Sequence, residues 1–295
     1  MTLNDAFKKF LMVKKLAGVT DKTLQCYRDF VGSFLHYLGD MSLSGLTQEL
    51  YQEYFLSLYK RQISKATVAT YIRHIKIFLK WLQDEYGLSL DAQKIHVPKS
   101  PKKNPHIYDD EEIRQIFRVI RKDENWLSVR NCAIVSLMLD SGLRQNETCT
   151  LRRKDLNWQF HYAKVFGKGE KERFVPLGNL SIRFLREYLE KCPYDGDFVF
   201  YTKDGEPMTR NAVKLFMHKL SCELPFEFSS HKLRHNFATN FLIDQYYEKG
   251  TMDIYALLTI LGHEDVKTTE RYLHIANQVV YSKSHISHMD KVFGF

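Results

Sequence analysis

Long apolar runs, a secretion signal and paired cysteines are all missing from this sequence. No apolar stretch approaches the ~18 residues that a membrane-spanning helix needs, and the opening MTLNDAFKKFLM lacks the charged-then-apolar order of a signal peptide. The cysteines are odd in number and scattered without a CxxC pair, at Cys26, Cys132, Cys149, Cys192 and Cys222. This pattern argues against a disulfide scaffold or a zinc ribbon. It predicts a cytoplasmic protein with reduced thiols and no membrane partner.

Motifs for metal and nucleotide chemistry are lacking as well. There is no acidic cluster suited to magnesium and no His/Cys spacing suited to zinc. There is also no GxxxxGK[ST] loop, and GKGEK at 167–171 is too short to cradle a triphosphate. A paired-metal nuclease or polymerase is therefore disfavoured, and we expect neither a metal nor any other cofactor.

The composition indicates a folded and slightly basic protein. Hydrophobic residues make up 44% and aromatic residues 14% of 295 residues, which is enough for real cores and excludes disorder as the main state. The length suits two domains of ordinary size or one unusually large domain. The net charge of +8 suggests a polyanionic partner, but its size alone is weak evidence.

The positive charge is concentrated in the first third of the chain. Residues 1–95 hold 13 basic and 9 acidic side chains, whereas the 189 residues after 106 hold 27 and 26. Between them, 96–106 (HVPKSPKKNPH) has three prolines and no acid, and its lysines are Lys99, Lys102 and Lys103. Proline disfavours helix and favours extended backbone. We interpret 96–106 as a basic interdomain linker, with a surface loop inside one domain as the alternative.

The first 95 residues are predicted to form about four helices, at 4–16, at 47–60 and at two longer apolar stripes. One stripe consists of Leu24, Tyr27, Val31, Phe34, Leu35 and Leu38, and the other of Val68, Tyr71, Ile72, Ile75, Leu79 and Leu82. On the second helix Arg73, Lys76 and Lys80 line up away from the apolar stripe, as a row that would suit a phosphate backbone. A solvated face without function explains this row equally well.

Beyond the linker the pattern is helical again, with one strand region. Helices are expected at 109–121 and 128–140, and from 178 onward. Between them, two β-branched and aromatic runs flank GKGE within 160–177, which predicts a β-hairpin. The fold class is therefore mainly α with a small antiparallel sheet.

Five short stretches differ from ordinary helix or hairpin sequence. They are SGLRQNE (141–147), GKGEKER (167–173), HKLRH (231–235), LGHE (261–264) and TTERY (268–272). A phosphodiester can be cleaved without metal if two guanidiniums clamp its oxygens, a tyrosine hydroxyl attacks, and a lysine or histidine protonates the leaving oxygen. The five stretches together supply each of those groups.

These five stretches, in this order, resemble the tyrosine recombinase (phage integrase) family over residues 107–275. In size and layout the chain is similar to Xer-type members and to compact transposon or plasmid recombinases. The resemblance implies a helical core-binding (SAM-like) DNA-binding domain at 1–95, the linker at 96–106, and an α+β catalytic domain with a C-terminal tail at 107–295. It also implies site-specific DNA cleavage and rejoining without ATP, for integration, excision or dimer resolution.

The resemblance carries roles over to individual residues. Arg144 and Arg234 would clamp the phosphate, and Tyr272 would attack it to give a 3′-phosphotyrosine and a free 5′-hydroxyl. Lys168 would be the general acid, with Lys164 and Lys171 as nearby rivals. The remaining residues would have supporting roles: His231 would assist proton transfer, His263 would bind the phosphate and orient the nucleophile, Glu147 would support an arginine or histidine, and His235 is expected to be structural.

Two parts of the sequence depart from the family or leave its usual roles open. The segment 236–260, with Tyr246 and Tyr247, is longer than usual and is expected to extend a helix or a loop. The tail from 277 onward is apolar enough to pack into a neighbouring protomer, although packing on its own domain is an equal alternative. The implied partner is double-stranded DNA, bound by a homotetramer or by a heterotetramer with a related recombinase.

Two other classes of protein remain open from the sequence. One is a catalytically silent DNA-binding protein on the same fold, and the other is a topoisomerase-like enzyme that uses the same tyrosine chemistry. The DNA sequence that is recognised cannot be read from these residues, because it depends on contacts to base edges and on DNA deformability.

Overall fold

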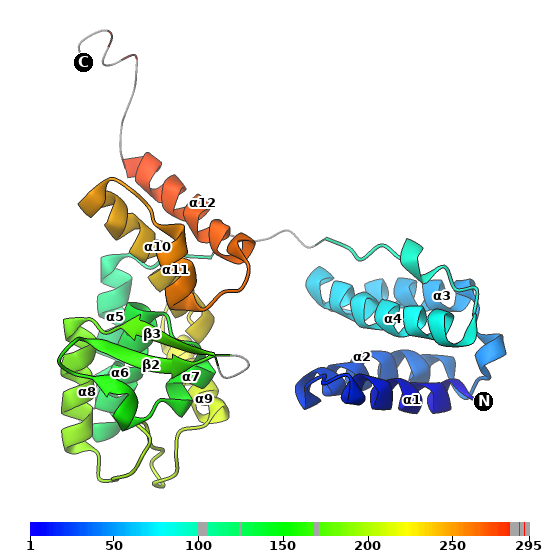
Figure 1. Cartoon of the computed structure of the whole chain (residues 1–295), viewed down its shortest axis with the longest axis horizontal. Coiled ribbons are helices and arrows are strands. Elements are labelled where there is room, and N and C mark those ends of the chain that lie inside the picture. Colours follow the sequence, from blue (N-terminus) through cyan, green and yellow to red (C-terminus); the bar gives the residue numbers. More distant parts are fainter. Residues whose placement is uncertain (100–104, 124, 168–170, 284–288, 290–291, 293–295) are drawn as a thin grey trace. The chain divides into compact units, whose positions relative to one another are not determined.

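The computed structural model describes residues 1–99, 105–123, 125–167 and 171–283, together with 289 and 292. The chain divides into two compact units, Met1–Lys103 and Asn104–Phe295 (Figure 1). The boundary between the units falls inside the stretch that the sequence analysis interprets as a linker. Three predicted site lysines, Lys102, Lys103 and Lys168, lie outside the described residues.

The N-terminal unit is helical, as predicted. Its helices are α1 (Leu3–Leu16), α2 (Asp21–Leu38), α3 (Gln48–Lys60) and α4 (Lys65–Tyr86), with short 3-10 turns η1 (Leu43–Gly45) and η2 (Ala92–Lys94). Side-chain caps begin three of the helices, at Thr2, Thr20 and Ser64. Each cap oxygen accepts a hydrogen bond from a backbone amide that the helix itself leaves unpaired. The predicted apolar stripes of α2 and α4 therefore lie on helices whose N-termini are stabilised by caps.

The core of the N-terminal unit is rich in aromatic side chains. Phe10 is fully buried and meets Tyr27, Phe78 and Trp81 in edge-to-face contacts with ring centroids 5.0–5.4 Å apart. Edge-to-face rings are favoured because the positive edge of one ring meets the negative face of the other. This core fixes which face of α4 points outward.

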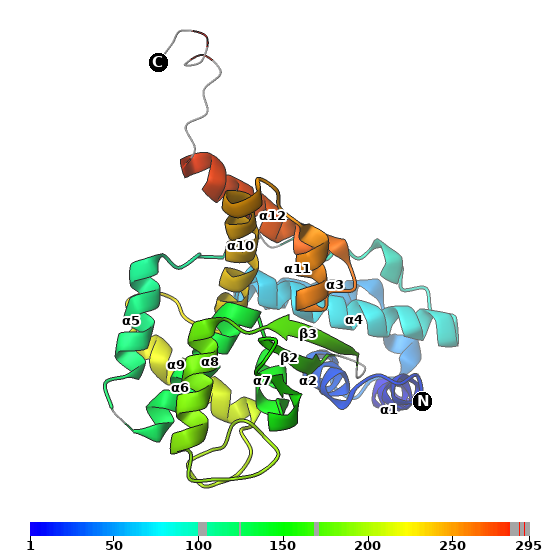
Figure 2. The ribbon, with the colours of Figure 1, turned by 60° about the vertical axis from the view of Figure 1, so that its left-hand side comes forward.

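The C-terminal unit is built around the nearly all-buried helix α6 (Trp126–Ser141). The other helices are α5 (Asp110–Ile120), α7 (Gln145–Thr150), α8 (Asn179–Lys191), α9 (Arg210–Glu223), α10 (Ser230–Lys249), α11 (Ile254–Leu261) and α12 (Val266–Lys283). Because both faces of α6 are apolar, neighbouring elements must cover it on several sides. Among them, α5, α8 and α10 contact α6 directly (Figure 2).

A small antiparallel sheet lies beside these helices, after the 3-10 turn η3 (Arg153–Asp155). Within the described residues it has the order β1 (Leu156–Asn157), β2 (Tyr162–Phe166), β3 (Glu172–Pro176), and Ala163 pairs with Val175. Ala163 and Val175 face the core, whereas Phe174 is exposed, as strand alternation requires. The predicted hairpin is confirmed, and so is the fold class of mainly α with a small antiparallel sheet.

The last three helices carry a smaller core of their own. It contains Phe237 and Leu242 from α10, Leu257 from α11, and Tyr272 and Val280 from α12. The segment 236–260, unusually long by sequence, is accommodated mainly by α10, which continues to Lys249 and ends at Gly250 in the left-handed region. Figure 1 shows α10, α11 and α12 packed together at one end of the C-terminal unit.

Candidate active site

Arg144 stands at the start of α7, just after a sharp turn. Gly142 ends α6 with φ of 60°, and a Cβ there would lie 2.3 Å from the ring of Phe237, so this turn requires glycine. The Arg144 Nη1 donates to Glu147 Oε1 at 2.9 Å, and its Nη2 donates to the carbonyl oxygen of Gly262 at 3.1 Å. The guanidinium is thereby aimed at the loop between α11 and α12 while its side chain stays 39% exposed.

Arg234 reaches the same loop from the first turns of α10. Its Nη2 donates to the carbonyl oxygen of Leu261 at 2.8 Å and lies 3.2 Å from His263 Nε2. Its Nη1 donates to the carbonyl oxygen of Gly142. Burial, and then the nearby charge of Arg144, lower the pKa of Arg234 to about 10, so the group remains a cation at neutral pH. Two guanidiniums from distant parts of the sequence thus meet at residues 261–263.

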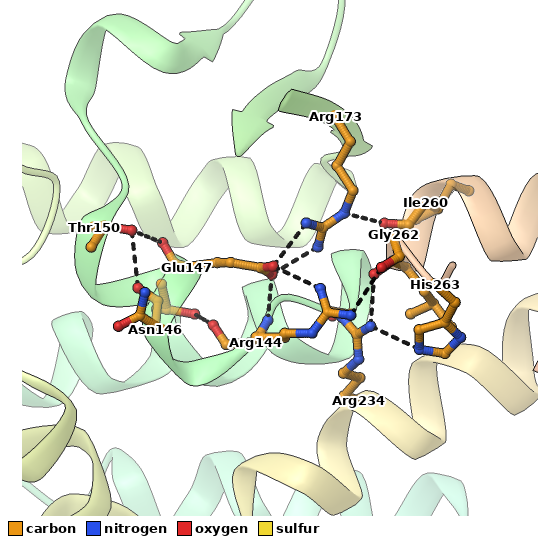
Figure 3. A network of polar contacts seen from close by, with 12 residues as sticks. Arg144, Asn146, Glu147, Thr150, Arg173, Arg234, Ile260, Gly262 and His263 are labelled. Atoms are coloured by element: carbon orange, nitrogen blue, oxygen red, sulfur yellow. Dashed lines mark hydrogen bonds and ion pairs between the residues drawn. The ribbon is translucent and has the colours of Figure 1, made fainter. Parts of the chain in front are cut away.

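Glu147 and Arg173 form a buried ion pair that supports both Arg144 and the loop that the two guanidiniums contact. Arg173 Nη1 and Nη2 donate to Glu147 Oε1 and Oε2 at 2.8 and 2.7 Å, and Arg173 Nε donates to the carbonyl oxygen of Ile260 at 2.7 Å (Figure 3). Burial alone would raise the pKa of Glu147, but the bonds to Arg173 and Arg144 outweigh it and lower that pKa. Glu147 thus contacts two arginines, and its supporting role in the reaction stays a prediction.

His263 is held in one tautomer by its two neighbours. A guanidinium can only donate, so Nε2 accepts from Arg234 and Nδ1 carries the proton that is donated to Thr269 Oγ1 at 2.8 Å. Burial, followed by the charges of Arg234 and Arg144, lowers the pKa of His263 to about 4. The ring is therefore neutral and fixed. It stacks on Tyr272 with ring centroids 6.3 Å apart and an interplanar angle of 17°.

Tyr272 lies on the first turns of α12 and is only 3% exposed. Its hydroxyl is 2.7 Å from Nδ1 of His235, and the Arg271 guanidinium lies over its ring. Burial raises the pKa of Tyr272, although Arg234, Arg271 and Arg144 each act to lower it. The hydroxyl is therefore protonated at neutral pH.

Some of the predicted site residues lie together in the structure, and others do not. Arg144, Glu147, Arg234, His263 and Tyr272 form one connected set. His231 is exposed on α10, with its ring 6.3 Å from that of His235. The two rivals of Lys168 have other partners, since Lys164 pairs with Glu172 at 3.4 Å and Lys171 with Glu264 at 2.7 Å.

The predicted DNA-contacting residues of the N-terminal unit behave differently from one another. Arg73 and Lys80 are exposed on α4. The Lys76 ammonium instead donates hydrogen bonds to the carbonyl oxygens of Gln93 and Ile95, at 3.2 and 2.7 Å. Lys76 therefore closes the turn after α4. Lys99 and Arg73 line one surface hollow of about 540 Å³.

Sequence reasoning missed Arg173 and the contact of His235 with Tyr272. Arg173 occupies an inward-facing position of β3, between exposed Glu172 and Phe174. A buried arginine on an alternating strand requires an anionic partner, and that signal could have identified it. His235 was expected to be structural, yet it contacts the Tyr272 hydroxyl. Its spacing of four from His231, which places both on one helix face, was the available signal.

Comparison with known proteins shows which family has this combination of domains. A model described as the phage integrase family matches residues 107–278, and one described as the phage integrase N-terminal SAM-like domain matches residues 6–88. The chain belongs to the phage integrase family. It is therefore an enzyme of the tyrosine recombinase type, whose members carry out site-specific DNA recombination, and the resemblance drawn from the five motifs is confirmed.

Relatives support this over nearly the whole chain. Tyrosine recombinase XerC of Staphylococcus epidermidis is 30% identical over 287 residues, covering 93% of this chain and 94% of the relative. Tyrosine recombinase XerD of Staphylococcus haemolyticus is 29% identical over 287 residues, with the same two coverages. The Tn1549 transposon integrase structure has a TM-score of 0.75 at 16% identity, covering 100% of this chain and 98% of that one, which is a likeness of fold.

No helix among the described residues is long and apolar enough to span a membrane. In the same residues, no group of three or more His, Cys, Asp or Glu side chains could hold a metal ion.

Proposed function

We propose that this recombinase cuts and rejoins double-stranded DNA through a covalent 3′-phosphotyrosine formed by Tyr272. The observation that carries the proposal is the direct connection between clamp and nucleophile. Arg234 contacts His263, and the His263 ring stacks on Tyr272. A phosphate held by Arg144 and Arg234 would therefore lie next to the tyrosine ring.

The charge balance around the loop at 260–263 favours an anion. Arg144, Arg173 and Arg234 meet there, and one buried carboxylate, Glu147, partners two of them. A scissile phosphate would add the missing negative charge, and the guanidiniums would stabilise the further charge that develops as phosphorus becomes five-coordinate. His263, fixed in orientation by Thr269, would complete the contact surface for the phosphate oxygens.

Bond making and breaking follow from these positions. The Tyr272 oxygen attacks phosphorus, the bond to the 5′-oxygen breaks, and that oxygen takes a proton from the general acid, for which the family resemblance predicts Lys168. The free 5′-hydroxyl of a partner strand then attacks the phosphotyrosine and releases the tyrosine. Because the covalent intermediate conserves the phosphodiester bond energy, rejoining needs no ATP, and arginines supply the cationic stabilisation that a metal supplies elsewhere.

The two units would share the work of binding. Residues 1–95 would form the core-binding domain, 96–106 a basic linker along the DNA backbone, and 107–295 the catalytic domain with its tail. Arg73, Lys80 and Lys99, with Lys102 and Lys103 in the linker, would contact phosphates, and Lys76 would hold the turn that positions Lys99. Binding through such contacts weakens steeply as salt rises. We expect an enzyme with this DNA substrate to act in the cytoplasm.

The assembly would be a tetramer on two DNA duplexes, either homotetrameric or formed with a related recombinase. A lambda integrase structure is described as a dimer bound to a core site, and the two duplexes of a recombination reaction call for two such dimers. A test of tail exchange must retain Val280, because this residue is fully buried in the core of α10–α12. Truncation after Lys283 spares that core and should preserve DNA binding while weakening synapsis. Normal recombination by this truncated protein would exclude tail exchange.

The proposal is tested by covalent capture from a library of nicked duplexes with randomised sequence. A nick beside the scissile phosphate lets a short 5′-hydroxyl fragment diffuse away, so the protein stays attached to the DNA. Sequencing of the captured DNA should give one motif and thereby the recombination site. Supercoiled plasmids carrying two copies of the motif then separate the outcomes: exchanged sites support a recombinase, whereas relaxed circles alone indicate a topoisomerase. Absence of any captured DNA indicates a silent DNA-binding protein.

A further inference from the structure

The Tyr272 hydroxyl makes a short hydrogen bond to a histidine outside the family's usual catalytic set. Its oxygen lies 2.7 Å from Nδ1 of His235, and the ring centroids are 5.4 Å apart. His235 is half-buried on α10, which packs against α12. The distance falls within the 2.6–3.2 Å range expected between a nucleophile and its general base.

The direction of this hydrogen bond can be worked out from the chemistry of the two groups. Burial, followed by the charges of Arg271, His231, Arg234 and Lys232 in that order, lowers the pKa of His235 to about 4, so the ring is neutral at pH 7. The phenol keeps its own proton at this pH because its pKa is raised. Nδ1 can then act as the acceptor while the hydroxyl donates. The oxygen lone pairs that do not face His235 are left to meet an electrophile.

The other two histidines of the site are less suited to take this proton. Both ring nitrogens of His263 are engaged, Nδ1 with Thr269 and Nε2 with Arg234. His231, which the family resemblance connects with proton transfer, lies one helical turn before His235 and is exposed. The ring of His231 is 6.3 Å from that of the half-buried His235.

We propose that His235 is the general base of the reaction: its Nδ1 takes the proton of Tyr272 as the tyrosine oxygen attacks, and returns it when the strand is rejoined. This rests on the proposed role of Tyr272 as nucleophile. In the forward step the Tyr272 O–P bond forms and the P–O5′ bond breaks. His235 becomes an imidazolium, and the leaving 5′-oxygen is protonated separately by the general acid. In the reverse step the imidazolium gives its proton back to the departing tyrosine oxygen.

DNA binding would make His235 a better proton acceptor. Burial is the largest factor that disfavours protonation of His235 in the free protein, and the charges of Arg271, His231, Arg234 and Lys232 add to it. A phosphate held by Arg144 and Arg234 brings a negative charge that offsets these cations, so the pKa of His235 rises when the substrate is present. The same histidine is thus kept unprotonated before binding and becomes more basic once the phosphate has arrived.

The test measures single-turnover formation of the covalent adduct on the nicked substrate, with the full-length protein. His235→Ala should slow adduct formation by about 100-fold or more, the usual contribution of a general base, while DNA binding is retained. His235→Asn should be nearly as slow, because an amide oxygen can accept the hydrogen bond but cannot take the proton. His274→Ala, an exposed histidine two residues after the nucleophile on α12, is the matched control and should react at the wild-type rate.

A more acidic nucleophile separates proton transfer from a structural role. Fluorinated tyrosine at position 272 loses its proton more easily, so it should reduce the His235→Ala defect by roughly tenfold or more, following Brønsted behaviour. The His231→Ala defect should not shrink in this way. Added imidazole should also restore part of the rate of His235→Ala. Rescue by the fluorinated residue in His231→Ala alone would overturn the proposal.

Two further outcomes would also overturn it, without touching the proposed function. One is adduct formation by His235→Asn at the wild-type rate. The other is adduct formation by His235→Ala at a rate above that of the wild type, which would mean that the hydrogen bond restrains the hydroxyl from attack. In either case the adduct would still depend on Tyr272. An adduct that persists in Tyr272→Phe would instead remove the proposed function itself.

Discussion

Arg173 on β3 and Glu147 on α7 form a two-pronged ion pair, with nitrogen–oxygen distances of 2.8 and 2.7 Å, and both side chains are almost fully buried. The pair fixes the carboxylate that also orients Arg144, and Arg173 continues to the carbonyl oxygen of Ile260. One bond network therefore ties the sheet, the first arginine and the His263 loop into a single rigid unit.

Removing the carboxylate should destabilise the C-terminal unit strongly. Glu147→Ala leaves Arg173 buried without its partner, and breaking a buried pair in this way costs about 3–5 kcal/mol. Urea unfolding followed by tryptophan fluorescence in a Trp81→Phe background reports on this unit, because Trp126 and Trp158 are the remaining tryptophans. Glu111→Ala is the control: it breaks an exposed pair with Arg118, for which about 0–1 kcal/mol is expected. Equal losses in the two variants would contradict the account.

The stabilising effect of Glu147 should depend on pH with a defined sign. Its pKa is lowered from 4.5 in the folded protein, so its contribution is fully present above the unfolded value and is lost as the pH falls through the lower folded value. Wild type and Glu147→Gln should therefore differ most in free energy of unfolding above pH 4.5, and the difference should shrink in acid. Urea titrations between neutral and acidic pH measure it. A difference that stays constant would mean that the carboxylate charge is not what stabilises the fold.

The turn before Arg144 should tolerate no side chain. A Cβ at Gly142 would meet the Phe237 ring at 2.3 Å, and φ is 60°. Gly142→Ala should therefore lose both stability and strand cleavage, since the Gly142 carbonyl also binds Arg234. Gly250→Ala provides the comparison, because φ there is 70° but nothing lies within 4 Å of the added carbon. Its cost should be about 1–2 kcal/mol of backbone strain alone, with cleavage retained. Thermal unfolding and adduct formation measure the two effects.

The basic row on α4 should divide into binding and structural members. Arg73→Ala should weaken DNA binding and reduce the slope of log K against log salt by about 0.9 for one lost phosphate contact. Lys76→Met should chiefly destabilise the N-terminal unit, because its ammonium bonds to the carbonyl oxygens of Gln93 and Ile95. Fluorescence anisotropy over a range of salt concentrations tests the first, and thermal unfolding tests the second. If the slope of log K against log salt for Arg73→Ala equals that of the wild type, this face of α4 does not contact the DNA.

Much of the fold could be predicted because periodicity is a local property of the sequence. The stripes of α2 and α4 and the hairpin at 160–177 are confirmed by the structure. The two-residue strand β1 was not predicted, since it is too short to show alternation. The motifs likewise identified Arg144, Arg234 and His263, whose contacts with one another or with one loop are now explicit.

Local pattern offers a signal for Arg173 and for His235, but it does not give their partners. Arg173 depends on where Glu147 and Ile260 lie, 26 and 87 positions away in the sequence. The partner of His235 is 37 positions away on another helix. Such contacts arise from tertiary packing. The sequence alone therefore does not show whether a histidine beside an arginine motif contacts the nucleophile.

The most direct test of the central claim is to map the covalent bond in the captured protein–DNA adduct. Mass spectrometry of the digested adduct should find Tyr272 joined to a 3′-phosphate, with a free 5′-hydroxyl on the released fragment, and Tyr272→Phe should give no adduct while still binding the same DNA. A nucleotide attached to any other residue, or an adduct that survives in Tyr272→Phe, would contradict the assignment of Tyr272 as the nucleophile.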